Sequence, residues 1–130
     1  MPLLDWSDPR FTLGHAEMDE THREFVALVN ALDGVADGEF RRRFTELCAH
    51  TAGHFAREEA LMDETRFPSA AEHKDEHRKV LGEMEQFRRR VERGVLPLGR
   101  AYVRERLPEW FALHAATMDS ALAAHLKVGR

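Results

Sequence analysis

Five histidines and two carboxylates recur in this 130-residue chain at spacings that would gather them on neighbouring helices. They fall in the segments DETH, HFAREE, HKDEH and HAATMD, and they are His22, His54, Glu58, His73, His77, His114 and Asp119. Within HFAREE and HKDEH the first and fifth residues are four apart, so both lie on one helical face. Ligands of these two kinds suit iron, and in principle also zinc, manganese or copper. The pattern therefore predicts a metal site whose ligands come from helices.

His114 and Asp119 form a less obvious pair, because they are five residues apart. Five residues leave the two side chains about 140° apart around an ideal helix at ~100° per residue, so regular periodicity would not bring them together. A locally widened turn would align them. We therefore expect an irregular turn here if both residues bind metal.

All five histidines occupy positions on apolar helical stripes, where leucine or methionine is the ordinary choice. One such histidine is usually a core residue that hydrogen-bonds to a neighbour. Five such histidines together with two carboxylates need another explanation. Each buried negative charge requires a positive charge nearby, and no lysine or arginine lies on these stripes close to the two carboxylates. Seven donors exceed what a tetrahedral zinc accepts. Two octahedral ions bridged by two carboxylates and one oxygen would use all seven and leave one position open.

The elements that would position these residues are four amphipathic helices. The turn signals place the first near 17–36, the second near 39–64, the third between a capping box at Ser69 and Gly94, and the fourth up to about Leu126. Short connections between long helices favour an all-α, up-down-up-down four-helix bundle. Residues 1–130 are expected to form a single domain.

Height along the bundle gives a further test, because antiparallel helices bring residues equidistant from a turn side by side. With Gly38 as the first turn, His22 and His54 are each 16 residues away. The same reasoning about the turns at Phe67 and Leu96 puts the remaining ligands at the same level. All seven groups are therefore predicted to share one layer of the bundle.

Composition excludes several classes of protein. Hydrophobic residues make up 43% and charged residues 32%, and no apolar run approaches the length that spans a membrane. The net charge of −4 argues against binding nucleic acid. The single cysteine, Cys48, and the absence of an export signal at the start favour the cytoplasm.

The ordered motifs resemble the hemerythrin family, in its single-domain bacterial form, over nearly the whole chain. The resemblance rests on Trp6, residues 19–22, HFAREE at 54–59, HKDEH at 73–77 and WFALHAATMD at 110–119. It implies a non-haem diiron centre that binds O2 or a similar small diatomic molecule. No nucleic acid or membrane partner is expected, and a protein recipient for the O2 is an open possibility.

The resemblance also assigns roles to the ligands. His73, His77 and His114 would hold one iron, His22 and His54 would hold the other, and Glu58 and Asp119 would bridge them together with an oxo or hydroxo group. O2 would bind end-on as a hydroperoxide at the iron that has two histidines. A ligand set this rich in neutral imidazoles favours reversible binding of a small molecule.

Trp110 and Phe111 are expected to line the O2 pocket. Where relatives tend to have Leu and Ile, this chain has Phe111 and Ala115, four residues apart on one face. The exchange either reshapes the pocket at little net change in volume or is ordinary repacking of the core. Pro108 removes a backbone donor within the fourth helix, so it should kink the helix or mark a restart.

Two polar residues near the ligands admit two interpretations each. Glu59 is either a solvated charge, which the sequence favours, or a partner of a ligand imidazole. His50 is either a partner of the site or, as the sequence favours, a partly solvated helix residue.

The leading functional hypothesis is an O2-binding protein for carriage, storage, delivery or sensing, without enzymatic turnover. The alternative is a diiron enzyme that acts on peroxide, nitric oxide or O2. A third possibility is a sensor or a purely structural metal bundle.

Overall fold

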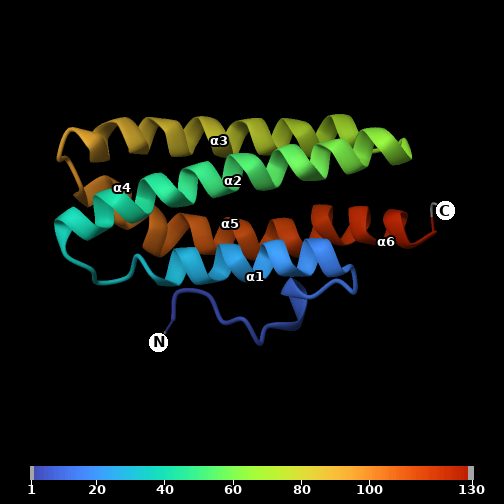
Figure 1. Ribbon diagram of the computed structural model, residues 1–130, viewed down its shortest axis with the longest axis horizontal. Coiled ribbons are helices and arrows are strands. Elements are labelled where there is room, and N and C mark those ends of the chain that lie inside the picture. The colour runs from blue at the N-terminus through green and yellow to red at the C-terminus, as the bar shows by residue number, and fades with distance from the viewer. Residues whose placement is uncertain (1, 129–130) are drawn as a thin grey trace.

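Four antiparallel helical rods make up the computed structural model, which describes residues 2–128 (Figure 1). The first three rods are α1 (Ala16–Asn30), α2 (Asp37–Thr65) and α3 (Ala70–Glu92), and the fourth is a chain of segments comprising α4 (Pro97–Ala101), η2 (Tyr102–Arg106), α5 (Leu107–His114), η3 (Ala115–Asp119) and α6 (Ser120–Val128). Successive rods alternate in direction, and no strand occurs among the described residues. The predicted all-α, up-down-up-down four-helix bundle is confirmed.

The helix ends differ from the sequence prediction at two places. The first helix ends at Asn30 and not near residue 36, because the chain turns at residues 31–34, where Gly34 adopts a positive φ of 72°. The turn therefore precedes the predicted Asp37-Gly38 site. Ser69 does occupy the N-cap position of α3, but its side chain forms no capping hydrogen bond, so the predicted capping box is absent.

The fourth rod contains two π-helical segments, η2 and η3. At the end of η2 the backbone N–H of Leu107 donates to the carbonyl of Tyr102, five residues earlier. A regular helix resumes at Leu107 with Pro108 in its first turn, where a missing N–H costs little. The predicted restart at Pro108 is confirmed. The widened turn of η2 ends just before Pro108 and places it in the first turn of α5, where a helix tolerates proline.

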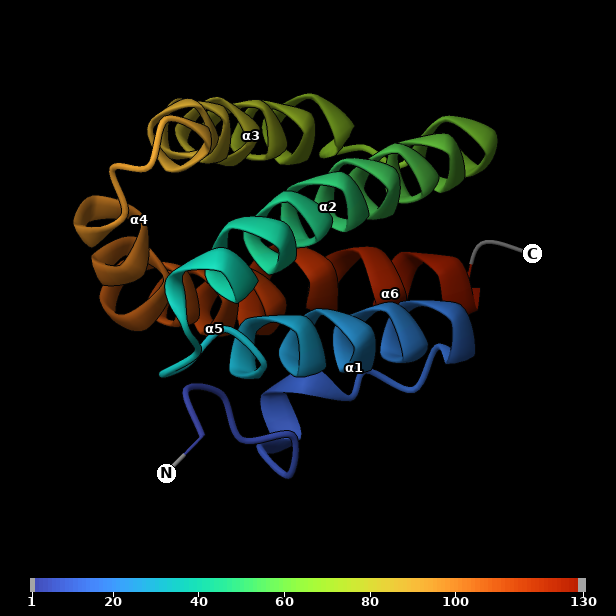
Figure 2. The same ribbon diagram turned by 60° about the vertical axis from the view of Figure 1, so that its left-hand side comes forward.

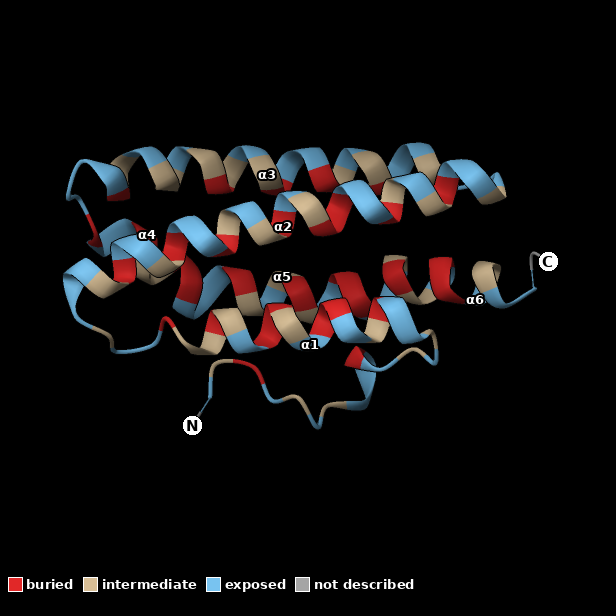
Figure 3. Ribbon diagram, in the orientation of Figure 1, coloured by how far each residue is buried: buried red, intermediate tan, exposed pale blue. Residues whose placement is uncertain are grey.

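Buried residues face the interior of the bundle on all four rods (Figure 3). They form a large apolar cluster, which includes Phe25, Phe44 and Met84, and a small one made of Met18, Met62, Leu122 and Ala123. The buried polar residues come between these two clusters along each rod, as His22 does between Met18 and Phe25. The core is therefore apolar at both ends and polar in the middle.

An N-terminal arm runs along the outer side of α1 (Figure 2). The amide side chain of Asn30 accepts from the backbone N–H of Leu4 and donates to its carbonyl, at 2.9 and 2.8 Å. The arm then enters the short 3-10 helix η1 (Pro9–Phe11), whose Phe11 side chain is buried. This path carries the backbone of Phe11 to the polar middle of the bundle.

Cys48 is partly buried, and its burial raises the pKa of the thiol to about 12, which disfavours the reactive thiolate. No helix within residues 2–128 is long and apolar enough to cross a membrane.

We predict that Gly99→Ala destabilises the bundle. A Cβ at residue 99 would lie 2.8 Å from Cγ2 of Val91 and 3.5 Å from the Phe40 ring, so the substitution should cost about 1–3 kcal/mol in free energy of unfolding. The matched control is Gly82→Ala in α3, where nothing lies within 4 Å. That change should be neutral or stabilise by up to about 1 kcal/mol. Urea-induced unfolding measures both, and equal effects would contradict the packing described.

Candidate metal centre

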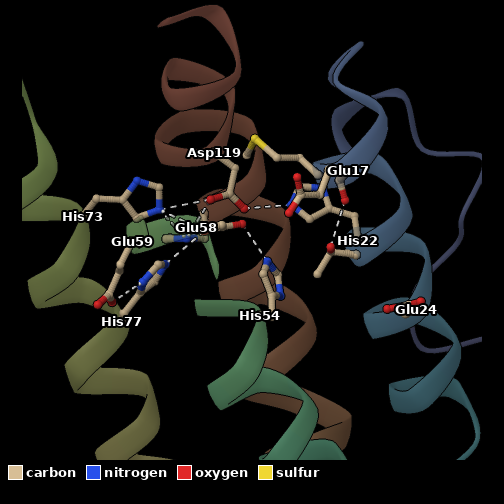
Figure 4. A network of polar contacts seen from close by, with 12 residues as sticks. Glu17, His22, Glu24, His54, Glu58, Glu59, His73, His77 and Asp119 are labelled. Carbon is tan, nitrogen blue, oxygen red and sulfur yellow. Dashed lines mark hydrogen bonds and ion pairs between the residues drawn. The ribbon is translucent and has the colours of Figure 1, made fainter. Parts of the chain in front are cut away.

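All seven predicted ligands lie together in the middle of the bundle and come from all four rods. Figure 4 labels six of them, all except His114. None of the seven is more than 4% exposed. Their ligand atoms fall into two groups in which every atom lies within 4.8 Å of the others. One group comprises Glu58, His73, His77, His114 and Asp119, and the other comprises His22, His54 and Glu58. The predicted single layer is confirmed, although the first turn is not at Gly38.

The three-histidine side gathers the Nε2 atoms of His73, His77 and His114. The Nε2 atoms of His73 and His114 are 3.2 Å apart, and each lies 3.1 Å from Oδ1 of Asp119. The Nε2 atom of His77 lies 3.3 Å from Oε1 of Glu58. Three nitrogens and two carboxylate oxygens therefore converge on one small volume, which is a suitable donor set for a divalent or trivalent cation.

The two-histidine side uses the other oxygen of each carboxylate. Oε2 of Glu58 lies 2.6 Å from Nε2 of His54, and Oδ2 of Asp119 lies 2.8 Å from Nε2 of His22. Each carboxylate thus directs one oxygen to the three-histidine side and one to the two-histidine side. This is the orientation that a carboxylate adopts when it bridges two cations.

The irregular turn expected between His114 and Asp119 is present. Residues Ala115–Asp119 form the π-helical segment η3, and the backbone N–H of Ser120 donates to the carbonyl of Ala115, five residues earlier. Widening the helix by one residue per turn rotates Asp119 onto the face of His114. Without this segment the two side chains would point in different directions.

The protonation pattern fits bound metal ions better than it fits a hydrogen-bonded cluster. Nδ1 of His22 donates to the carbonyl of Phe11 at 2.9 Å, which leaves the Nε2 lone pair free for a metal. In the described part of the chain Oε1 of Glu58, Oδ1 of Asp119 and Nε2 of His77 are buried and have no hydrogen-bond partner. Buried polar atoms in that state are costly, and cations placed between them would satisfy them.

The electrostatics of Asp119 point the same way. Burial alone would raise the pKa of its carboxyl group, but the imidazoles of His114, His22 and His73 that face it hold the pKa well below its usual range. Asp119 is therefore an anion even though it is fully buried. An anionic carboxylate among imidazoles is ready to bind cations.

Aromatic rings hold the imidazoles of the three-histidine side. Phe55 stacks on His77 with ring centroids 3.8 Å apart and an interplanar angle of 2°. Trp110 stacks on His114 at 4.6 Å and 19°, and its Nε1 donates to Glu76 at 2.8 Å. These contacts fix the planes of both imidazoles.

The two expected pocket residues lie on different sides of the centre. Phe111 is buried and presents its ring to the imidazole of His22, with centroids 5.2 Å apart and an angle of 82°. Trp110, by its contact with His114, lies on the three-histidine side. Only Phe111 is therefore placed beside the two-histidine side.

The sequence leaves two interpretations of Glu59 open, and the structure supports the less favoured one. Oε2 of Glu59 accepts from Nδ1 of His77 at 2.9 Å, so Glu59 is a partner of a ligand imidazole. Its spacing on α2 gave no sign of this contact, since His77 is on another rod. The carbonyl of Phe11 could not be identified at all, because a backbone group leaves no trace in the residue types. His50 is part-buried, its Nε2 lies 3.0 Å from Oε1 of Glu24, and its ring meets the ring of the ligand His54 with centroids 6.2 Å apart. It is therefore both partly solvated and next to a ligand, so neither interpretation is excluded.

We predict that Glu59→Ala weakens metal binding at the three-histidine side by about 10–100-fold, because the Nδ1 proton of His77 loses its acceptor and the imidazole loses basicity. Competition with a chelator of known affinity measures the change. Glu64→Ala removes an exposed carboxylate from the same helix and serves as the control. Equal metal loss in the two variants would refute a role for Glu59 in orienting His77.

Comparisons with known proteins agree with this geometry. The model of the hemerythrin HHE cation binding domain matches residues 13–126. The bacteriohemerythrin of Ralstonia nicotianae is 39% identical over 126 residues, which cover 97% of this chain and 90% of that protein. The bacteriohemerythrin of Stenotrophomonas maltophilia is 30% identical over 132 residues, with coverage of 98% and 84%.

Solved structures show the same fold. The crystal structure of a hemerythrin mutant superposes with a TM-score of 0.90 at 22% identity and covers 98% of this chain and all of that one. The family model describes a cation binding domain and spans most of the chain, and the matched residues include all seven buried donors. This chain therefore belongs to the hemerythrin family.

Proposed function

We propose that this protein binds O2 reversibly at a non-haem diiron centre. The observation that carries the proposal is the orientation of Glu58 and Asp119, each of which directs one oxygen to each group of histidines. Two irons bridged by these carboxylates and by one oxo or hydroxo oxygen would use all seven donors. Membership of the hemerythrin family supports iron as the metal and O2 as the ligand.

The unequal number of histidines supports one open coordination position. Three imidazoles, two carboxylates and a bridging oxygen complete an octahedral ion, whereas the ion beside His22 and His54 would lack one ligand. When bound, the two irons would supply the electrons for reversible, end-on binding of O2, and His22 and His54 would hold the iron that has the open position. The protein itself has to position the ligands and exclude water.

Apolar rings next to His22 suit the second task. Phe111 stacks on Phe25 with ring centroids 4.5 Å apart and contacts Phe11 at 5.0 Å, and all three side chains are buried. Apolar rings packed at this place would disfavour water and anions beside the two-histidine side and would tolerate a small neutral molecule. Access of protons and water would otherwise promote loss of the bound O2 together with oxidation of the metals.

The opposite side of the centre is built for rigidity. The stacked rings of Phe55 and Trp110 and the carboxylate of Glu59 hold His77 and His114 from outside. The three-histidine ion would thus keep its coordination unchanged while the ligand enters and leaves at the other ion. This division of roles suits reversible binding better than substrate turnover.

We further propose that residues 1–130 act as one domain in the cytoplasm. The four rods share a continuous core, and a single unpaired thiol at Cys48 is consistent with a reducing compartment. Delivery of O2 to a protein recipient is compatible with this arrangement.

An optical titration tests the function. The reduced, metal-loaded protein should be colourless without O2, develop a visible absorption band when O2 is added, and lose that band when O2 is removed under argon. Continuous O2 consumption with no recoverable coloured form would contradict reversible binding and favour a diiron enzyme.

Two variants tie the colour to the assigned ligands. His77→Ala should lose one of two metals per chain and the coloured form. His125→Ala removes an imidazole that lies outside the ligand set and hydrogen-bonds to the carbonyl of Thr65 at 2.9 Å, so this variant should keep both metals and the colour. Two metals and normal colour in His77→Ala would overturn the ligand assignment.

A further inference from the structure

A cavity of about 390 Å³ lies between the α2–α3 turn and the η3–α6 part of the fourth rod. It is lined by Phe67, Ser69, Glu72, His73, Thr117, Met118 and Ala121. Its volume falls in the range of about 300–1,000 Å³ that is typical of pockets for small organic molecules and is far larger than a diatomic ligand needs. The O2-binding function proposed above makes no use of it.

His73 connects this cavity to the metal centre. Its side chain is only 2% exposed, so it closes the inner end of the cavity, while its Nε2 points away from it toward Asp119. A molecule in the cavity would therefore contact a metal ligand from the side opposite to the metals. The proposed O2 position lies beside His22 on the other side of the centre, so the two ligands would not compete.

The walls of the cavity favour a flat apolar molecule. The rings of Phe67 and His73 meet edge to face with centroids 6.4 Å apart, and they provide an aromatic wall. Met118 offers a flexible thioether, which makes favourable contacts with aromatic rings, and Ala121 leaves space at the opposite wall. An aromatic ring between these groups would gain both kinds of contact.

Charge excludes anions from the same space. No lysine or arginine lines the cavity, and the carboxylate of Glu72 stands at its exposed edge. An anion would lose its hydration against the apolar walls without a cation to pair with, and Glu72 and the net charge of −4 would add a weak repulsion. A cation would gain little, because a single exposed carboxylate is screened by water. An uncharged molecule fits best.

One polar group at the inner end calls for a hydrogen-bond acceptor. If Nε2 of His73 binds metal, the neutral imidazole carries its proton on Nδ1, a step that rests on the proposed diiron function. Nδ1 is buried and has no hydrogen-bond partner among residues 2–128. Phe67 and Met118 line the cavity beside it and are only partly buried, so a ligand would displace part of these side chains to reach Nδ1. A ligand oxygen would supply the missing acceptor.

We propose that this cavity binds a small uncharged aromatic molecule whose carbonyl or hydroxyl oxygen accepts a hydrogen bond from Nδ1 of His73. Such a ligand would alter the environment of the three-histidine ion without occupying the O2 position. The site is thus distinct from the O2 pocket in place and in ligand chemistry.

Fluorine NMR of para-fluoroacetophenone with the oxidised, metal-loaded protein tests this proposal. Wild type should bind the probe, and Ala121→Trp, which fills the cavity from its exposed wall, should weaken binding by at least about tenfold, or ~1.4 kcal/mol. Ala52→Trp places the same ring on an exposed alanine of α2 and should bind the probe as wild type does. No binding to wild type, or equal binding to the two variants, would overturn the proposal.

Two other probes test the chemistry of the ligand. Para-fluorobenzoate should bind at least about tenfold more weakly than the neutral ketone, and Glu72→Gln should narrow that difference. Para-fluoroethylbenzene, which lacks the oxygen, should also bind more weakly than the ketone, and equal binding would refute the hydrogen bond to His73.

Metal content and O2-dependent colour are measured on the same samples. If both are normal and the probe does not bind, the cavity proposal fails while the O2-binding function stands. If both are lost in wild type, the function itself fails.

Discussion

Two negative charges, on Glu58 and Asp119, are buried in the middle of a helical bundle that is otherwise packed with apolar side chains. An uncompensated charge in such a place costs several kcal/mol, so the fold requires positive charge at the same level. Five imidazoles surround the two carboxylates, and the pairing of each oxygen with a different histidine group leaves room for one cation on either side. Metal ions bound there would balance the buried charge of the core and would also provide the place where a ligand binds.

The irregular features of the bundle follow from this requirement. The π-helical segment η3 departs from regular geometry so that Asp119 can share a face with His114. The N-terminal arm lies against α1 and brings the carbonyl of Phe11 to Nδ1 of His22. Apolar clusters on both sides of the polar layer keep water out and strengthen the electrostatic interactions within it. The widened turn of η3 and the N-terminal arm therefore support the same seven residues.

Much of this arrangement could be predicted from the sequence, and the exceptions have physical causes. Side chains four apart on one helix, such as His54 and Glu58, are neighbours whatever the fold. The predicted heights of the histidines along the bundle were correct even though the first turn was placed wrongly, because antiparallel helices that run side by side keep these residues at about the same height. The need for a widened turn before Asp119 also followed from helical geometry.

Contacts between residues on different rods could not be predicted from the sequence in this way. Glu59 and His77 meet only because α2 and α3 pack in one particular rotation, and the carbonyl of Phe11 is invisible in residue types. The first turn lies at residues 31–34, where Gly34 adopts a positive φ that most other residues avoid, whereas Gly38 lies inside α2. The presence of a glycine in the sequence does not say which backbone conformation that glycine adopts.

The account depends on two cations that share both carboxylates, and anomalous X-ray scattering from crystals of the iron-loaded protein tests this most directly. At the iron absorption edge we expect two peaks about 3.5–4 Å apart, one beside the three-histidine group and one beside His22 and His54, with Glu58 and Asp119 contacting both. A single peak, or a carboxylate that contacts only one of two peaks, would contradict the account.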